Sequence, residues 1–335
     1  MADRELVTLA QYLLSEQAEH PETESEFWTL IAQMAYVAKV IARETRRAAL
    51  VGRLGQVGER NPTGDTQKKL DVFANEVAVG AFHRSGLVAA IVSEEMDEPK
   101  ATLSGSAGRY ILCIDPLDGS SNTDTNGSVG TIFGFFRRSC QGRCSSIETE
   151  LRQGTSLVAS GYALYGPSTV FVYTRGRTVT GFTLDHDLGE FLLSHDALHC
   201  PPRGQTYSAN LGRVQEWDGG IQRFVAHLGE RDSASGRPFS LRYSGALVAD
   251  VHRTLIEGGI YFYPADALHR EGKLRLLYEG APLALVVETA GGRASTGHQP
   301  IAEITPTSLH QRVPLALGSR EDVQLYERFA AGQDA

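Results

Sequence analysis

The sequence predicts an α/β fold, and three patterns along the chain carry that prediction. The first third has the apolar spacing of an amphipathic helix, and the middle has the alternating apolar and polar residues of antiparallel strands. In the last third, strands and helices alternate. The chain has 335 residues, 41% hydrophobic and 21% charged, which is typical of a globular protein with a substantial core. This length favours one large domain or two closely packed ones, and Cys200–Gly204 is the expected boundary between residues 1–200 and 201–335.

The first third of the chain is predicted to supply two helices and a strand. Apolar residues recur every three or four positions across 25–45, as in a long helix with one buried face. Glycines and an Asn-Pro pair indicate a loop at 53–64. A second helix follows 64–71, and 87–92 has the apolar run of a short buried strand.

Acidic residues accompany these elements. Asp65 and Asp71 flank the start of the second helix, and Glu94 and Glu95 follow the strand. Taken alone, the first pair resembles a solvated helix start, and the second is as well explained by a surface acidic turn. Their meaning depends on what they meet in space.

The central feature of the sequence is Tyr110–Asn122, YILCIDPLDGSSN. Its apolar first half predicts a buried strand, which we expect to end at Asp115 because Pro116 cannot donate to a sheet ladder. The small residues of Gly119–Asn122 can turn their backbone N–H groups toward an anion. Asp115 and Asp118 beside such a cradle indicate hard cations that neutralise a phosphate. An ordinary acidic turn is the alternative, and the length of the motif disfavours it.

The rest of the chain alternates strands and helices. We expect a strand at 129–137, a polar insertion at 139–154 and antiparallel strands across 156–183. Beyond the boundary the predicted elements are a helix at 246–257, a strand at 260–263, an amphipathic helix at 273–290, a strand at 313–317 and a closing helix at 320–330.

Charge and hydropathy argue against two classes of partner. A formal net charge of −8 is unlike the basic surface of a nucleic-acid-binding protein. No apolar run is long enough to span a membrane, and the N-terminus lacks a basic segment followed by an apolar one. We therefore expect a cytoplasmic protein with neither nucleic acid nor membrane as partner. An anionic substrate remains compatible, because bound metal ions reverse the local charge.

The acidic residues suit metal-assisted phosphate chemistry. The set is Asp65, Asp71, Glu94, Glu95, Asp115, Asp118 and Glu279. A phosphate monoester repels a nucleophile by its own charge, and cations held by carboxylates offset that charge. Oxygen ligands suit Mg²⁺, or Mn²⁺ as the alternative, better than zinc. Because no Ser-His-Asp or Cys-His signature stands out, we expect attack by a metal-activated water with a spare carboxylate as its base.

Two further groups of residues are open to more than one interpretation. Residues of the second half could line a sugar pocket, although each is as well explained as an ordinary partly buried side chain: Asn210, Tyr243, Tyr261, Tyr263 and Lys273. Cys140 and Cys144 lie in the polar insertion with arginines nearby. Two exposed reduced thiols are the plainer interpretation, and a thiol switch is the alternative.

These motifs together resemble the class I fructose-1,6-bisphosphatases. The matching stretches are GDTQKKLD at 64–71, SEE at 93–95, DPLDGSSN at 115–122, GTIFG at 130–134, RYSGALVADVHRTL at 242–255 and GKLRLLYE at 272–279. The Asp-Pro-Leu-Asp-Gly motif is shared with other lithium-sensitive phosphatases, whereas the remaining stretches in this order are specific to the bisphosphatases. The resemblance implies a layered fold of mixed sheets sandwiched by helices, a homotetramer, and hydrolysis of the 1-phosphate of fructose 1,6-bisphosphate with Mg²⁺.

The resemblance also implies roles for individual residues. Metal ions would be held by Glu94, Asp115, Asp118, Glu279 and the backbone carbonyl of Leu117. Asp71 and Glu95 would draw the proton from the attacking water, and Asp65 would lie on a mobile loop over the metals. The scissile phosphate would be held by the amides of Gly119, Ser120 and Ser121. The substrate would further contact Asp118, Asn210, Tyr243, Tyr261, Phe262, Tyr263, Lys273 and, from a neighbouring subunit, Arg242. Residues 1–200 would thus carry the metal and phosphate site with an allosteric-type region, and 201–335 would bind the sugar phosphate.

Some positions depart from the family pattern. Acidic residues in Glu24–Thr29 stand where many members bind the phosphate of AMP, although Arg109, Tyr110 and Arg137 match the rest of that site. Arg213 stands where the family usually has a tyrosine near the 6-phosphate, and it could still donate to that group. Hydrolysis of fructose 1,6-bisphosphate would serve gluconeogenesis or a Calvin cycle. Sedoheptulose 1,7-bisphosphate as a second substrate is one alternative. A non-catalytic sugar-phosphate sensor is the other, and the complete acidic set disfavours it.

Overall fold

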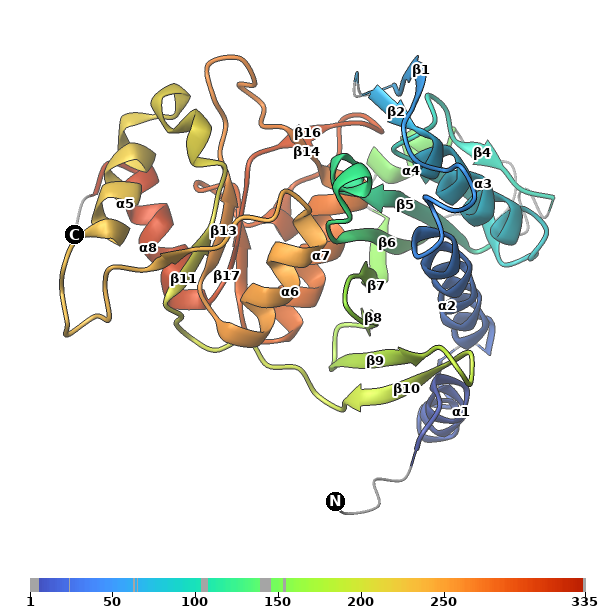
Figure 1. The fold of residues 1–335 in the computed structure, drawn as a ribbon. Coiled ribbons are helices and arrows are strands. Elements are labelled where there is room, and N and C mark those ends of the chain that lie inside the picture. The colour runs from blue at the N-terminus through green and yellow to red at the C-terminus, as the bar shows by residue number, and fades with distance from the viewer. Residues whose placement is uncertain are drawn as a thin grey trace.

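The computed structural model describes residues 6–23, 25–62, 64, 66–103, 108–138, 146–152 and 155–333, which fold into two sheets with helices on their faces (Figure 1). The larger sheet has eight strands in the order β10-β9-β8-β7-β6-β5-β3-β4. Their bounds are β3 Val88–Ser93, β4 Lys100–Ala101, β5 Tyr110–Asp118, β6 Val129–Arg137, β7 Ser156–Tyr165, β8 Thr169–Thr174, β9 Val179–Asp185 and β10 Glu190–His195. The β3–β5 pair is parallel and the other neighbours are antiparallel, so the sheet is mixed.

The smaller sheet has five strands in the order β12-β11-β13-β17-β15. Its strands are β11 Thr206–Ser208, β12 Ser240–Leu241, β13 Ile260–Tyr263, β15 Arg293–Ser295 and β17 Leu315–Gly318. Two short antiparallel pairs stand apart from the sheets: β1 Gln56–Arg60 with β2 Thr66–Lys68, and β14 Leu274–Arg275 with β16 Arg312–Val313.

Helices and sheets alternate as five layers across the molecule (Figure 1). On one side of the large sheet lie α2 Ser25–Thr45 and α3 Lys69–His83, with α1 Leu9–Glu19 near its β10 edge. The short α4, Ile147–Arg152, packs through Leu151 against the opposite face of β5. Between the two sheets lie α6 Leu247–Glu257 and α7 Ala281–Thr289, and beyond the small sheet lie α5 Gly219–Gly229 and α8 Arg320–Ala330. Short 3-10 helices occupy Ser120–Thr125 (η2), Leu211–Glu216 (η3) and Ile301–Glu303 (η5), and η4, Leu276–Gly280, is a π-helix. The expectation of mixed sheets sandwiched by helices is confirmed.

Four hydrophobic clusters within the described part of the chain hold these layers together, and the smallest joins α4 and η4 to β3, β5 and β6. The other three are larger. One joins α2 and α3 to the large sheet, one surrounds α6 and α7, and one joins α5 and α8 to the small sheet. Burial of this apolar area is the main force that fixes the layers relative to one another. No helix among the described residues has the length and apolarity that crossing a membrane requires.

The expected end of the central strand at Asp115 is wrong, because β5 continues to Asp118. The neighbour β3 pairs with β5 only as far as Ile114, so Pro116 needs no donor on that side. On the other side the register with β6 shifts between Asp115 and Asp118, and the Pro116 carbonyl accepts a bond from the Thr131 hydroxyl at 2.8 Å. The proline therefore lies in a bulge rather than at a strand end.

Two elements of the second half differ from the sequence prediction. Instead of one helix over 273–290, the chain forms β14, the π-helix η4 and then α7, whose first turn contains Pro282. Instead of one strand over 313–317, Pro314 separates β16 from β17, and the two strands belong to different sheets. Pairing between β14 and β16 accounts for both differences, since residues far apart in sequence decide it.

Two predicted loops also contain regular structure. The 53–64 loop holds β1, and the polar insertion at 139–154 holds α4. Residues 139–145, with Cys140 and Cys144, lie outside the described residues.

Two ion pairs that involve α4, one buried and one exposed, allow a test of how burial affects the cost of removing one partner. Arg138 contacts Glu150 at 2.7 Å with both side chains buried, and Arg152 contacts Glu148 at the same distance with both exposed. We expect Arg138→Met to lower the free energy of unfolding by about 3–5 kcal/mol, because it leaves a buried carboxylate without its partner. Arg152→Met should cost less than about 1 kcal/mol. Urea unfolding of both variants measures the difference, and equal losses would contradict the argument.

Candidate active site

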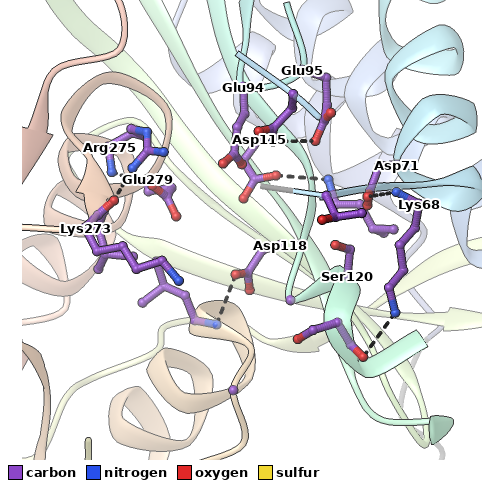
Figure 2. A pocket seen from close by; sticks show the side chains of 18 of the residues that line it. Lys68, Asp71, Glu94, Glu95, Asp115, Asp118, Ser120, Lys273, Arg275 and Glu279 are labelled. Atoms are coloured by element: carbon purple, nitrogen blue, oxygen red, sulfur yellow. Dashed lines mark hydrogen bonds between the residues drawn. The ribbon is translucent and has the colours of Figure 1, made fainter. Parts of the chain in front are cut away.

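A cavity of about 480 Å³ opens where the ends of β3 and β5 meet η2, η4 and the β1–β2 hairpin. Figure 2 shows the acidic side chains of these separate elements pointing into one space. Acidic residues of the lining are Asp71, Glu94, Glu95, Asp115, Asp118 and Glu279. The structure thus brings together six of the seven acids that the sequence singled out, and Asp65 lies outside the described residues.

Three buried carboxylates form the centre of the cavity. Asp115, Asp118 and Glu279 each offer an oxygen, and these oxygens lie within 4.8 Å of one another. The first two come from the bulged end of β5, and the third comes from η4. Such a set of oxygen donors, with no nitrogen or sulfur among them, suits a hard divalent cation.

Backbone N–H groups hold each of these carboxylates in place. Asp115 accepts from the Leu117 amide at 3.0 Å, and Glu279 accepts from the Arg275 amide. Asp118 accepts from Leu247 and Val248 at 3.1 and 2.7 Å, so it caps the N-terminus of α6. The positive end of the helix dipole favours a carboxylate there.

The π-helix explains how Glu279 reaches the site. Its first amide, on Leu276, donates to the Gln311 carbonyl at 2.8 Å, which ties η4 to the segment before β16. Widened helical turns of this kind are rare and occur mostly at functional sites. In a regular helix over 273–290 the Glu279 side chain would point in a different direction, so the π-helix determines where this carboxylate lies.

Asp71 and Glu95 lie beside the central trio. Asp71 is in the first turn of α3, where its Oδ2 accepts from the Lys68 amide at 2.7 Å. Its Oδ1 is buried without a hydrogen bond of ordinary geometry, although the Ser120 hydroxyl faces that side. Glu95 accepts from Gln67 Nε2 at 2.5 Å and from Asn61 Nδ2 at 3.5 Å.

Burial and mutual repulsion disfavour charge on these acids. Burial raises the pKa of Asp71 to about 7, with a smaller contribution from Glu95, against the opposing bond from Lys68. Burial also raises the pKa of Asp118 to about 7, and it raises that of Asp115 well above its usual range with help from Glu94. A bound cation would remove this penalty, so the residues present fit a divalent metal.

The predicted phosphate cradle begins at a position that only glycine fits. Gly119 has φ of 73°, and a Cβ there would lie 2.4 Å from that of Ala246. Ser120 and Ser121 start η2 directly after it, and all three residues line the cavity. The cradle thus lies next to the carboxylate trio.

Residues expected to bind the sugar are divided between two places. Four of them line the same cavity: Tyr243, Tyr261, Tyr263 and Lys273. Figure 2 shows Lys273 on the side opposite Asp71 and Ser120. Three others lie outside the described lining: Asn210, Arg242 and Phe262. Asn210 precedes η3, Arg242 is exposed, and Phe262 is fully buried in the core of the small sheet.

Several residues of the site went unnoticed in the sequence. Lys68 lines the cavity and ties it to η2 through Asp124 at 2.8 Å and the Ser121 carbonyl at 3.3 Å. Arg275 lines the cavity with 2% of its surface exposed. Both lie inside stretches that resemble the family, but nothing in their local pattern distinguishes them from solvated charges.

Acidic side chains lie beside two arginines at the positions where the chain was compared with the family pattern. Arg109 lies 3.8 Å from the Glu26 carboxylate, so an acid of this chain faces the residue that matches the AMP site. Arg213 lies 3.2 Å from Asp266 and 3.1 Å from Glu216.

Comparisons with known proteins cover nearly the whole chain. The family model for the fructose-1-6-bisphosphatase N-terminal domain matches residues 7–196, and that for the C-terminal domain matches 200–331. A class 1 fructose-1,6-bisphosphatase of Acaryochloris marina is 57% identical over 304 residues, 91% of each chain. One of Chloroherpeton thalassium is 47% identical over 329 residues, 98% of this chain and 94% of the relative. The holo crystal structure of Leishmania major fructose-1,6-bisphosphatase has a TM-score of 0.91 at 40% identity, covering 98% of this chain and all of that one.

The raised pKa of Asp71 predicts how the metal-free protein responds to pH. Because the folded-state pKa of about 7 exceeds the ordinary 3.8, the contribution of Asp71 to stability is complete below about pH 4 and is lost as the pH rises through 7. Asp71→Asn keeps an acceptor for Lys68 and buries no charge. Its advantage over wild type in free energy of unfolding should grow by on the order of 2 kcal/mol from pH 5 to pH 8. Urea unfolding in EDTA measures this, and an advantage independent of pH would contradict it.

Proposed function

The chain belongs to the fructose-1,6-bisphosphatase family and hydrolyses fructose 1,6-bisphosphate to fructose 6-phosphate and phosphate, and we propose that the acidic cavity is where it does so. One observation carries the proposal, which is that three buried carboxylate oxygens lie within 4.8 Å of one another. The cavity beside them is large enough for a small phosphorylated sugar.

The metal would be held by the trio together with Glu94 and the carbonyl of Leu117. Glu94 and Leu117 line the same cavity, and Glu94 acts electrostatically on Asp115. We propose Mg²⁺ as the physiological ion, with Mn²⁺ as a substitute, because the donors are all oxygens. When bound, such an ion offsets the charge of the phosphate and stabilises the leaving oxygen.

Asp71 supplies the base in this proposal, with Glu95 assisting. A general base must lie within reach of the proton that it abstracts, and Asp71 lines the cavity that holds the trio. Its Oδ1 is buried without a hydrogen bond of ordinary geometry, so this oxygen has capacity to accept the proton of a water attacking phosphorus. Gln67 and Asn61 hold the Glu95 carboxylate beside it.

The substrate would lie across the cavity between two sets of residues. The amides of Gly119, Ser120 and Ser121 would receive the 1-phosphate beside the metal ligands. On the other side, Lys273 would pair with the 6-phosphate, and Tyr243, Tyr261 and Tyr263 would contact the sugar. Asp65, Asn210 and Phe262 keep the roles that the resemblance implies.

The proposal extends to organisation and assembly. Residues 1–200 would form the domain with the metal and 1-phosphate, and 201–335 the domain that binds the sugar phosphate. A homotetramer would explain why Arg242 is exposed and outside the cavity of its own chain, since it would then reach a neighbour's site. We also propose a cytoplasmic location, in keeping with the family's metabolic role, which cell fractionation tests.

The role of Asp71 is tested by phosphate release from fructose 1,6-bisphosphate at saturating Mg²⁺. We expect Asp71→Asn to lower kcat by about 10²–10⁴-fold, the usual contribution of a general base. Glu288→Gln is the matched control, because burial also raises the pKa of this partly buried carboxyl and it lies outside the cavity. EDTA should abolish activity of the wild type. Near-normal turnover of Asp71→Asn would assign the base elsewhere, and EDTA-resistant turnover would remove the metal.

Mixed assemblies test whether Arg242 acts across subunits. Asp71→Asn and Arg242→Gln chains, coexpressed and purified as one species through two tags, should regain activity, because some sites then combine an intact Asp71 with a neighbour's intact Arg242. Asp71→Asn with Lys273→Gln should regain none, since Lys273 lines the cavity of its own chain. Sedimentation velocity should give a species of four chains. A monomer, or equal behaviour of the two mixtures, would contradict the assembly.

A further inference from the structure

One side chain bonds to both of the distant segments that carry acids of the site. Glu94 and Glu95 lie in the turn after β3, and Glu279 lies in η4, nearly 200 residues later. His310 Nδ1 lies 2.9 Å from the hydroxyl of Tyr278, the residue before Glu279. His310 Nε2 lies 3.3 Å from the carbonyl of Asp97, in the segment that follows Glu95.

The donors in this chain of bonds follow from the chemistry of the groups. A carbonyl only accepts, so Nε2 carries a proton and donates to Asp97. In the neutral ring Nδ1 is then an acceptor, and the Tyr278 hydroxyl donates to it. A phenol is protonated at neutral pH, so the Tyr278 hydroxyl has the proton that it donates.

Tyr278 and the segment that carries His310 are both held in place by further contacts. Tyr278 is fully buried in a hydrophobic cluster with Val92 of β3 and Ile111 of β5, and Leu309 packs against that cluster. The Tyr278 and His310 rings meet edge to face with centroids 5.9 Å apart. On the other side of η4, the Leu276 amide bonds to the Gln311 carbonyl at 2.8 Å. The backbone around His310 is therefore fixed to the π-helix from two directions.

Local hydrogen bonds hold the turn after β3 to its own strand and to β5. The Glu94 amide donates to the Ile114 carbonyl at 3.1 Å, the Met96 amide donates to the Ser93 carbonyl at 3.3 Å, and the Glu95 amide donates to the Ser93 hydroxyl oxygen at 3.3 Å. The bond from His310 to the Asp97 carbonyl ties this turn to the segment that is bonded to η4.

We propose that His310 is a positioning residue for the metal site, which sets the distance between the turn that carries Glu94 and Glu95 and the π-helix that carries Glu279. The inference rests on the proposed function of that site. His310 touches neither substrate nor metal; it acts through Tyr278 and Asp97. Groups that orient metal ligands from outside typically change metal affinity by about 10–100-fold when removed.

The chain contains a matched pair elsewhere for comparison. The Tyr162 hydroxyl lies 2.8 Å from His252 Nδ1, with ring centroids 5.8 Å apart and edge to face. Tyr162 is also fully buried, but in the cluster around α6 and α7 and outside the described cavity lining. Tyr278→Phe and Tyr162→Phe thus delete the same kind of hydroxyl–imidazole bond in two places, and we expect them to lower the thermal midpoint to a similar extent.

The experiment measures Mn²⁺ binding to the full-length protein by the electron paramagnetic resonance signal of unbound Mn²⁺, alongside the thermal midpoint in EDTA. We expect Tyr278→Phe and His310→Phe to weaken Mn²⁺ binding about 5–20-fold, and Tyr162→Phe to leave it within about twofold. His310→Gln, whose amide can still donate to Asp97, should recover part of the affinity. The Mg²⁺ concentration for half-maximal phosphate release should rise in parallel, while kcat at saturating Mg²⁺ changes little.

The outcomes separate the inference from the function beneath it. The positioning role is wrong if Tyr278→Phe and His310→Phe lose no more Mn²⁺ affinity than Tyr162→Phe at an equal loss of thermal midpoint. That result would leave the proposed metal site unaffected. Absence of Mn²⁺ binding by the wild type overturns the proposed metal site itself. A fall in kcat at saturating Mg²⁺ with unchanged metal affinity also overturns the inference, because it would place His310 in the chemistry instead.

Discussion

The repulsion among three carboxylates that are buried close together is the constraint on which the rest of the site depends. Asp115, Asp118 and Glu279 would be more stable apart, and burial raises the pKa of the two aspartates. Backbone amides at a bulge, a helix N-terminus and a π-helix hold them together nonetheless. The repulsion among these carboxylates thus lowers the stability of the metal-free fold, and a bound divalent cation would offset it. Such local destabilisation is typical of functional sites.

The layered architecture decides where this strained set can exist. Asp118 comes from the large sheet, yet it caps α6, which lies between the two sheets, and Glu279 approaches from the segment that precedes α7. Acids of the first half and polar residues of the second half meet only because these layers pack. In the proposed function, catalysis and recognition of the sugar phosphate both use this interface, so a disturbance of the interface would affect both.

Short irregular segments give the site its geometry within this regular frame. The bulge around Pro116 directs Asp115 and Asp118 to one cavity, and the left-handed turn at Gly119 brings the cradle close to Ala246. His310 joins two other irregular segments, η4 and the turn after β3, from outside the cavity. Rigid layers with a few fixed irregularities can hold ligands to within the tolerance that metal binding requires.

Much of the fold follows from local sequence patterns. The helix at 25–45, the strand at 129–137 and the helix at 320–330 occur with the predicted bounds, because periodicity and turn residues determine such elements locally. The acids of the motifs likewise lie together. Only the tertiary structure decided the course of 273–290 and 313–317, since β14 pairs with β16 across the chain. It also decided that Lys68 and Arg275 line the cavity and that His310 bonds to both Tyr278 and Asp97, because contacts between distant residues leave no periodic trace in a sequence.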